Sequence, residues 1–186
     1  MSWKLIIPPT ALAIALADGQ RAARVDVDEG GKSPLDDEIR AAIETYTSEA
    51  ETITKRAIME QTWRLTLDRF DGAIKLAYAP LLAVEHVKYL DVDGVLRTLA
   101  PQDYQADAES EPGYIVPAPG CAWPETADRI NALQVQIRCG YGADHTAVPA
   151  GIRGFVYARV AEQYQTGKHA ENQHVTGQLS RFVVYG

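Results

Sequence analysis

Cysteine and histidine are scarce in this chain of 186 residues. Its two cysteines, Cys121 and Cys139, are too few for the disulfide framework of a small secreted protein, and their spacing matches no metal motif. Cys139 falls on the apolar side of an alternating pattern, so we expect a buried free thiol there. The four histidines form neither an H-E-x-x-H motif nor a Cys/His cluster, and we predict no metal site.

Positive charge and long apolar runs are also lacking. The 18 lysines and arginines are outnumbered by 25 aspartates and glutamates, which gives a net charge of −7. Because basic side chains drive binding to nucleic acid phosphates, we expect no surface that grips nucleic acid. No stretch approaches the about 20 apolar residues of a membrane span. The apolar start of the chain is interrupted by Pro8 and Pro9 and has no cationic lead beyond Lys4, so we interpret it as structural rather than as a targeting segment.

Motifs that carry catalysis are missing too. The sequence contains no G-x-S-x-G, P-loop or G-x-G-x-x-G pattern. The acidic stretch from Asp26 matches a calcium loop at its first, third and sixth positions, but Gly30 and Pro34 replace later ligands. We therefore predict an ordinary acidic loop, and no catalytic, metal-binding or cofactor-binding residues.

A period of 3.6 residues predicts three helices, over about residues 10–24, 34–56 and 149–166. The second is marked most clearly, with Ser33 as N-cap, Pro34 at the first helical position and acidic residues in the first turn. Apolar residues of the second and third helices recur on one face of each and are expected to pack the core: Leu35, Ile39, Ile43, Tyr46, Ile53, Ile152, Phe155, Val156 and Val160.

Between these helices the period changes to two, which predicts a block of antiparallel strands over about residues 61–140. Residues 62–68 alternate and are expected to pair with residues 73–78. The buried side changes near Glu85 and His86, which indicates either a bulge or a change of partner strand there. Asp93-Gly94 predicts a hairpin with a type I′ turn. The clearest alternation puts four residues on the buried side: Leu133, Val135, Ile137 and Cys139. Five or so strands would form one small sheet with one buried face.

These elements predict an α+β fold, organised as one domain with an insertion. Residues 1–60 and 147–168 would form a helical core, residues 61–146 a β insertion, and residues 169–186 a carboxy-terminal arm. The arm is polar until its last residues, where apolar side chains cluster: Leu179, Phe182, Val183 and Tyr185. We interpret this cluster as the anchor of an interface.

Seven segments follow one another along the chain: LADGQRAARVD, DDEIRAAIETYTSEAETITKRAI, MEQTWRLTLDRF, PLLAVEHVKYLDVDG, LAPQDYQAD, YIVPAPGCAWPETADRINALQVQIRCGYG and VPAGIRGFVYARVAEQYQ. In this order they resemble the head–tail connector (adaptor, or head-completion) proteins of long-tailed bacteriophages, in the branch with a β insertion. The resemblance runs from about Leu16 to Gln165, and Gly19 and Gln20 depart from it, since members usually have better helix formers there.

The resemblance implies a structural virion protein at the capsid vertex, present in the host cytoplasm during viral assembly. Such proteins form rings, commonly of about twelve subunits, beneath the portal protein. The ring extends the DNA channel and offers a docking surface to a tail-side stopper or terminator protein. DNA would pass through the lumen without specific binding, and no cofactor or membrane is implied.

Within such a ring the helices would surround the lumen, the strand block would project outward or toward the tail, and the arm would reach the portal. Deleting residues 179–186 should then abolish portal binding and leave the fold intact. Two alternatives stay open: another tail-side morphogenesis protein, such as a terminator or stopper, and a small enzyme with a dispersed site.

Overall fold

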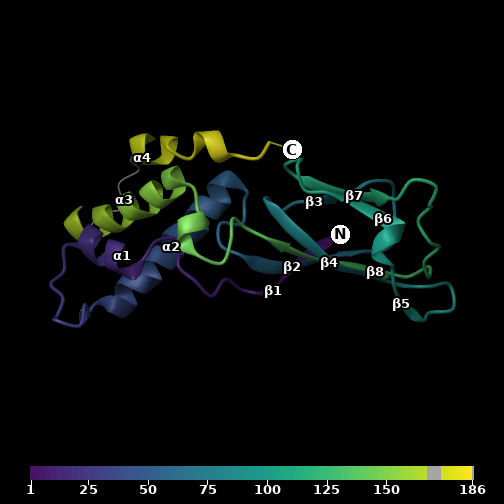
Figure 1. Cartoon of the computed structure of the whole chain (residues 1–186), viewed down its shortest axis with the longest axis horizontal. Helices are drawn as coiled ribbons and strands as arrows, with labels where there is room; N and C mark the ends of the chain where they lie inside the picture. Colours follow the sequence, from purple (N-terminus) through teal and green to yellow (C-terminus); the bar gives the residue numbers. More distant parts are fainter. Residues whose placement is uncertain (167–172, 186) are drawn as a thin grey trace. The chain divides into compact units, whose positions relative to one another are not determined.

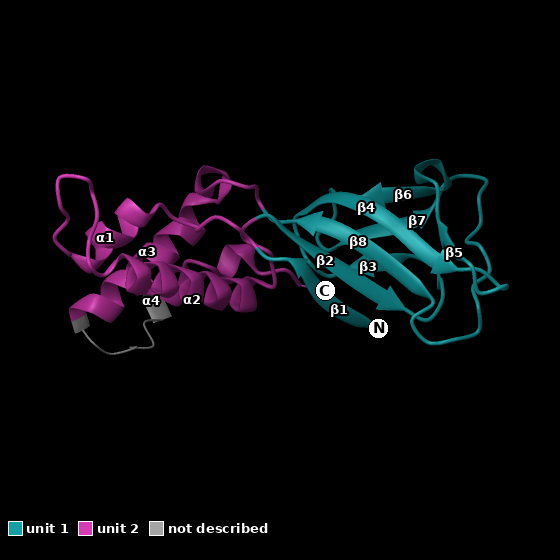
Figure 2. Cartoon of the chain, turned by 90° about the horizontal axis from the view of Figure 1, so that it is seen from below, with its two compact units in different colours: residues 1–8, 60–140, 186 teal, residues 9–59, 141–185 magenta. Residues whose placement is uncertain are grey.

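The computed structural model describes residues 1–166 and 173–185, which form two compact units (Figure 2). The β unit comprises residues 1–8 and 60–140; the helical unit comprises residues 9–59 and 141–185. Within these described residues, four helices and two antiparallel sheets confirm the predicted α+β fold. Residues 1–8, which we had assigned to the helical core, belong to the β unit because they form its first strand.

The larger sheet of the β unit has the strand order β1-β2-β8-β4-β5, and each neighbouring pair is antiparallel (Figure 1). The first and last strands leave two open edges. Its strands are β1 (Ser2–Ile7), β2 (Gln61–Leu67), β4 (Leu81–Leu90), β5 (Leu96–Thr98) and β8 (Leu133–Cys139).

A second sheet, in the order β3-β7-β6, covers one face of the first. Its strands are β3 (Ile74–Leu76), β6 (Tyr104–Asp107) and β7 (Gly113–Pro117), and the short 3-10 helix η1 (Pro101–Asp103) precedes β6. The two sheets enclose an apolar core to which both contribute fully buried side chains: Leu65, Leu76, Val87, Ile115, Leu133, Val135 and Ile137. The predicted inward face of residues 133–139 is therefore observed, and Cys139 is buried and forms no disulfide, as expected.

Two expectations for the strand block are wrong. Residues 74–76 pair with β7 and not with residues 62–68, so there are two sheets instead of one. The Asp93-Gly94 turn is not type I′, because only Gly94 has a positive φ, at 76°. The Gly94 amide donates to the carbonyl oxygen of Asp91 at 2.8 Å, which closes a turn with aspartate first and glycine fourth. Of the two explanations for the change of side near Glu85 and His86, a bulge is observed: the β4–β8 register shifts between Val84 and His86.

The helical unit packs three longer helices around an apolar core. They are α1 (Leu16–Ala23), α2 (Asp36–Thr54) and α3 (Ala150–Thr166), followed by α4 (Gln173–Gly177), with 3-10 turns η2 (His145–Ala147) and η3 (Ser180–Phe182). Most residues predicted to pack this core are buried in it: Ile39, Ile43, Tyr46, Ile152, Phe155, Val156 and Val160. Ile53 is partly buried against the same cluster.

Two helices begin later than the sequence predicts. α1 starts at Leu16 instead of residue 10, because its N-cap residue Ala15 has an extended backbone, with φ −60° and ψ 145°. α2 starts at Asp36, with Leu35 as its N-cap residue and no side-chain cap from Ser33. Leu35 consequently lies outside the packed face and is 38% exposed.

Gly19 and Gln20 of α1 have definite structural roles. A β-carbon at position 19 would lie 2.7 Å from Cγ2 of Ile39 and 2.8 Å from Cδ1 of Ile43, so glycine lets α1 approach α2 closely. The buried Gln20 amide donates to the carbonyl oxygen of Gly31 at 3.0 Å and to Asp36 Oδ1 at 2.6 Å. Gln20 thus joins α1 to the acidic loop and to the start of α2.

A polar cluster joins α2 to α3. The Arg159 guanidinium donates to both carboxylate oxygens of Glu49 and to Glu162, and the Tyr46 hydroxyl donates to Gln163 at 2.9 Å. The Arg159 side chain is only 11% exposed and lies 5.2 Å from the centre of the Tyr46 ring. Its charge is therefore balanced locally by two carboxylates and an aromatic face.

Candidate interaction surfaces

One face of the five-stranded sheet is polar and cationic, and we call it the basic face. Lys4 pairs in register with Arg64, Arg64 with Gln136, and Gln136 with His86. Residues directly opposite one another in a sheet project to the same side, so these four form one row across β1, β2, β8 and β4. Because Leu65, Val135 and Val87 point into the core, this row lies on the side turned away from the three-stranded sheet, which Figure 2 views.

The basic face carries more cations than carboxylates. Its cations are Lys4, Arg64, Lys88 and Arg138, and its carboxylates are Glu60 and Glu85. Both carboxylates are occupied within the sheet: Arg138 pairs with Glu60 at 3.2 Å, and the Gln136 amide donates to Glu85 at 2.7 Å. Among the described residues, Lys4, Arg64 and Lys88 have no ion-pair partner.

The pKa of His86 is lowered by burial and by the neighbouring positive charges of the basic face. Burial lowers the pKa of its imidazole below the ordinary 6.5, and the Lys88 and Arg64 charges lower it further, while Glu85 opposes them. The imidazole is therefore neutral at physiological pH, and the net charge of the face comes from lysine and arginine.

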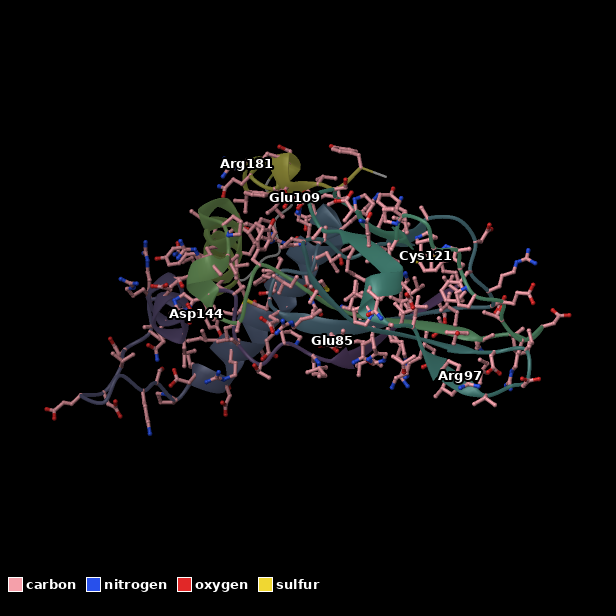
Figure 3. The ribbon with its side chains drawn as sticks, turned by 45° about the vertical axis from the view of Figure 1, so that its right-hand side comes forward. Glu85, Arg97, Glu109, Cys121, Asp144 and Arg181 are labelled. Atoms are coloured by element: carbon pink, nitrogen blue, oxygen red, sulfur yellow. The ribbon has the colours of Figure 1, made fainter. Side chains whose placement is uncertain are left out.

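The opposite layer of the β unit has more carboxylates than cations, although Lys75 of β3 lies on its outward side, directly opposite Tyr114. Between Arg97 and Arg129 the sequence has no lysine, arginine or histidine. Its β6 region carries a group of four carboxylates that we call the acidic strip: Asp103, Asp107, Glu109 and Glu111. Glu109 and Glu85 mark these two layers and lie on opposite sides of the β unit in Figure 3.

Asp107 is held as a carboxylate by the turn that follows it. Its Oδ1 accepts hydrogen bonds from the amides of Glu109 at 2.9 Å and Ser110 at 3.0 Å. Hydrogen bonding from Ser110, by side chain and backbone, lowers the pKa of Asp107. The acidic strip therefore keeps this charge well into the acidic pH range.

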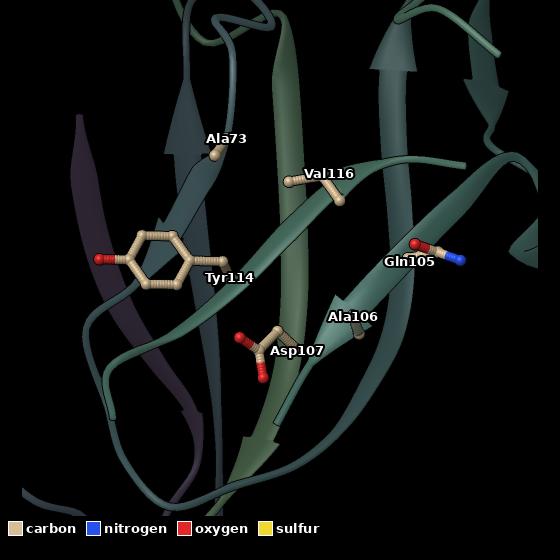
Figure 4. Close-up of a pocket in the computed structure, with 6 residues that line it drawn as sticks. All are labelled: Ala73, Gln105, Ala106, Asp107, Tyr114 and Val116. Atoms are coloured by element: carbon tan, nitrogen blue, oxygen red, sulfur yellow. The ribbon is translucent and has the colours of Figure 1, made fainter. Parts of the chain in front are cut away.

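A hollow of about 580 Å³ lies on the three-stranded sheet beside the acidic strip (Figure 4). Asp107 and Tyr114 are opposite one another in register, so a carboxylate and a phenol ring share this surface. Its lining residues are Ala73, Gln105, Ala106, Asp107, Tyr114 and Val116. A second hollow, of about 620 Å³, is lined by Asp68, Arg69 and residues 126–130.

The carboxy-terminal segment packs on the helical unit, which corrects the expectation of a projecting arm. Leu179 is fully buried, Phe182 and Val183 are half-buried, and Tyr185 is 81% exposed. Arg56 Nε donates to the carbonyl oxygen of Phe182 at 2.6 Å, and the Val184 amide donates to that of Thr54 at 2.9 Å. The predicted anchors therefore do not form one exposed cluster, and residues 167–172 and 186 of the predicted arm lie outside the described residues.

The described residues hold neither a group of three or more potential metal ligands nor a helix long and apolar enough to cross a membrane.

Exposed apolar side chains gather on the hairpin between β4 and β5, where Val92, Val95 and Leu96 are 63%, 48% and 59% exposed. Asp91 stabilises this hairpin by accepting from the amides of Asp93 and Val95 and pairing with Arg97 at 2.8 Å.

Sequence reasoning missed the basic face and the acidic strip as surfaces. The alternation of residues 62–68 and 133–139 did indicate an outward polar side, but the neighbours of each strand were unknown. Lys4 could not be placed beside Arg64, since residues 1–8 were not recognised as a strand. The long interval without a basic residue was the available signal for the acidic layer.

Comparison with known proteins gives a match in structure but none in sequence. No protein-family model matches the chain, and no curated protein matches it. It is similar to a chain in the neck of an empty gene transfer agent (GTA) particle computed with C6 symmetry, with a TM-score of 0.80 and 18% identity. It is also similar to a chain in the virion of a native GTA particle, with a TM-score of 0.79 and 18% identity.

A third similar chain belongs to the neck of a native GTA particle computed with C12 symmetry, with a TM-score of 0.68 and 21% identity. Each of the three comparisons covers 100% of this chain and 97% of the other. Both units are therefore included in the likeness, and the chain has the fold of these GTA neck and virion chains.

Proposed function

We propose that this chain is a structural protein of the neck of a phage-like particle, where it works in the virion and has no catalytic role. The observation that carries the proposal is the similarity over the full chain to GTA neck chains, with TM-scores up to 0.80. The order of sequence segments supports the same assignment independently, since it resembles phage head–tail connectors.

Within the neck, we assign the chain to the adaptor position, between the portal protein and a tail-side stopper or terminator. Copies would form a ring of about twelve, and the neighbour computed with C12 symmetry is consistent with that number. A charge of −7 on each copy makes such a ring strongly anionic, which favours passage of DNA through the lumen without adhesion.

The portal would bind the exposed end of the carboxy-terminal segment. Tyr185 offers an exposed aromatic side chain, the half-buried Val183 lies two positions before it, and Leu179 fixes the segment to the helical unit. We expect Tyr185→Ala to weaken portal binding without loss of folded protein. Tyr157→Ala is the matched control, because Tyr157 is a 40% exposed tyrosine of the same unit.

The mass of the protein in solution tests the assignment. Light scattering would be measured for the chain alone and mixed with the portal protein of the same particle, followed by electron microscopy of the products. A ring of the chain, formed alone or on the portal, supports the adaptor role. A chain that does not bind the portal protein but binds the tail-side proteins would overturn that role in favour of a terminator or stopper. A compact monomer that binds neither the portal protein nor the tail-side proteins would overturn the assignment as a structural neck protein.

A further inference from the structure

We propose that neighbouring copies of this chain bind through opposite layers of the β unit, with the basic face of one copy on the acidic strip of the next. This inference rests on the proposed ring and names the contact that builds it. The partner is a second copy, because both complementary surfaces belong to the same chain.

The placement of the two surfaces suits a ring. The basic face belongs to the five-stranded sheet and the acidic strip to the layer on its other side, so each copy presents opposite charge on its two sides. A contact between different surfaces is heterologous, and its repetition gives a closed ring when the rotation closes. A two-fold dimer through either surface would bring like charges together, which disfavours it.

Three cations of the basic face also lack carboxylate partners among the described residues. Lys4 and Arg64 are directly opposite one another on neighbouring strands, an arrangement that destabilises a sheet when the charges are alike. Among the described residues neither has a carboxylate partner, and Lys88 lacks one too. Carboxylates of a neighbouring copy would remove this repulsion and neutralise the cations.

The acidic layer provides a receptor for a long cationic side chain. In the hollow beside the strip, the ionised Asp107 and the ring of Tyr114 are together, and both are partners that arginine prefers. Lys75 borders Tyr114 on its other side, but the four carboxylates of the acidic strip outnumber this cation. Arg64 lies in the middle of the basic row and is half-buried among its neighbours. We assign Arg64 of one copy to the hollow of the next.

Two reciprocal charge-reversal variants test the contact. Variant A carries Lys4→Glu and Arg64→Glu, which make its basic face acidic. Variant B carries Asp103→Lys and Glu109→Lys, which make its acidic strip basic and leave the turn-forming Asp107 in place. Arg21→Glu in the helical unit is the matched control, since Arg21 is an exposed arginine that pairs only within its own helix. Circular dichroism and thermal melting establish that each variant is folded.

The readout is ring formation by light scattering, alone or on the portal, at several protein and salt concentrations. We expect A alone and B alone to assemble at about tenfold to a hundredfold higher protein concentration than the unmodified chain. An equimolar mixture should assemble normally with A and B alternating, because every junction in it joins opposite charges. Added salt should weaken the unmodified ring.

Each result has one meaning. Rings formed by A alone or B alone as readily as by the unmodified chain would overturn this contact and leave the proposed function standing. So would a mixture of folded A and B that fails to assemble. If A forms rings but loses affinity for duplex DNA, the basic face is a DNA contact, and the inference is again wrong. If the unmodified chain forms no ring even on its portal, the proposed function itself fails.

Discussion

Gly19 of α1 lies so close to α2 that an added β-carbon would be 2.7 Å from Cγ2 of Ile39. Real β-carbons do not approach neighbouring atoms this closely, so any larger residue must displace α1 or the isoleucine. The glycine that weakens α1 as an isolated helix is thus required by the packing of the unit. Local helix propensity and tertiary contact make opposite demands at this position, and the contact prevails.

We expect Gly19→Ala to lower the free energy of unfolding by about 1 to 2 kcal/mol, because overpacking outweighs the gain in helix propensity. Gly154→Ala in α3 is the matched control. A β-carbon there would have its nearest contact at 3.5 Å, to Gln178, so the same change should stabilise the protein by up to about 1 kcal/mol. Urea unfolding of both variants measures the difference; stabilisation by Gly19→Ala would contradict the close packing.

Loss of the carboxy-terminal segment should destabilise the helical unit. Leu179→Ala removes a fully buried side chain and should cost about 2 to 4 kcal/mol of unfolding free energy. Truncation before residue 179 should cost at least as much, contrary to the expectation from sequence that the fold survives it. Tyr185→Ala should leave the unfolding free energy unchanged within about 0.5 kcal/mol, since this side chain is 81% exposed. Equal, small effects of all three changes would mean that the segment does not pack as described.

The Arg159 cluster should contribute more to stability than a surface pair. Arg159→Ala leaves the Glu49 and Glu162 carboxylates without their partner, and we expect a loss of about 2 kcal/mol. Arg21→Ala breaks the exposed pair with Asp18 in α1 and should cost less than about 0.5 kcal/mol. Chemical denaturation separates the two cases. Similar losses for both variants would show that the Arg159 cluster is screened like a surface pair.

The lowered pKa of His86 makes stability depend on pH. Unfolded His86 binds a proton near its ordinary pKa of 6.5, whereas the folded protein resists protonation because the group is buried near Lys88 and Arg64. The unfolded state therefore binds more protons below pH 6.5, and the folded state loses stability as the pH falls through 6.5 toward the folded pKa. His86→Gln removes this contribution, so its stability relative to the unmodified protein should rise between about pH 7.5 and about pH 5. A difference that stays constant between these two pH values would show that the pKa is not lowered.

The sequence predicted correctly those helices and strands whose buried side repeats regularly along a single segment. The apolar stripes of α2 and α3 and the alternation of residues 133–139 each repeat several times, and the structure buries those faces. β1 was not predicted, because six residues with exposed Leu5 and Ile7 carry no clear period, and their role depends on pairing with β2 nearly sixty positions later. The start of α1 was misjudged for a similar reason, since Ala13 and Ile14 are buried by partners that no local pattern names.

The candidate surfaces were harder to predict than the fold. Placing Lys4, Arg64 and His86 in one row requires the strand order and the register of three pairings, and neither is encoded in any one segment. Tyr185 is exposed, and its role as an anchor stays a prediction. Leu179 was misassigned, because a short apolar cluster looks the same in sequence whether it packs in its own core or against a partner.

The placement of β1 also sets an order of events during synthesis. Every strand of the β unit lies within the first 140 residues, so all of that unit has been translated before α3 begins at Ala150. The helical unit starts at residue 9, but its core needs Ile152, Phe155 and Leu179. On the ribosome, the β unit can fold before α3, the helix against which α1 and α2 pack, has been translated. We therefore expect nascent chains stalled soon after residue 140 has emerged to carry a protease-resistant β unit and an unprotected helical segment.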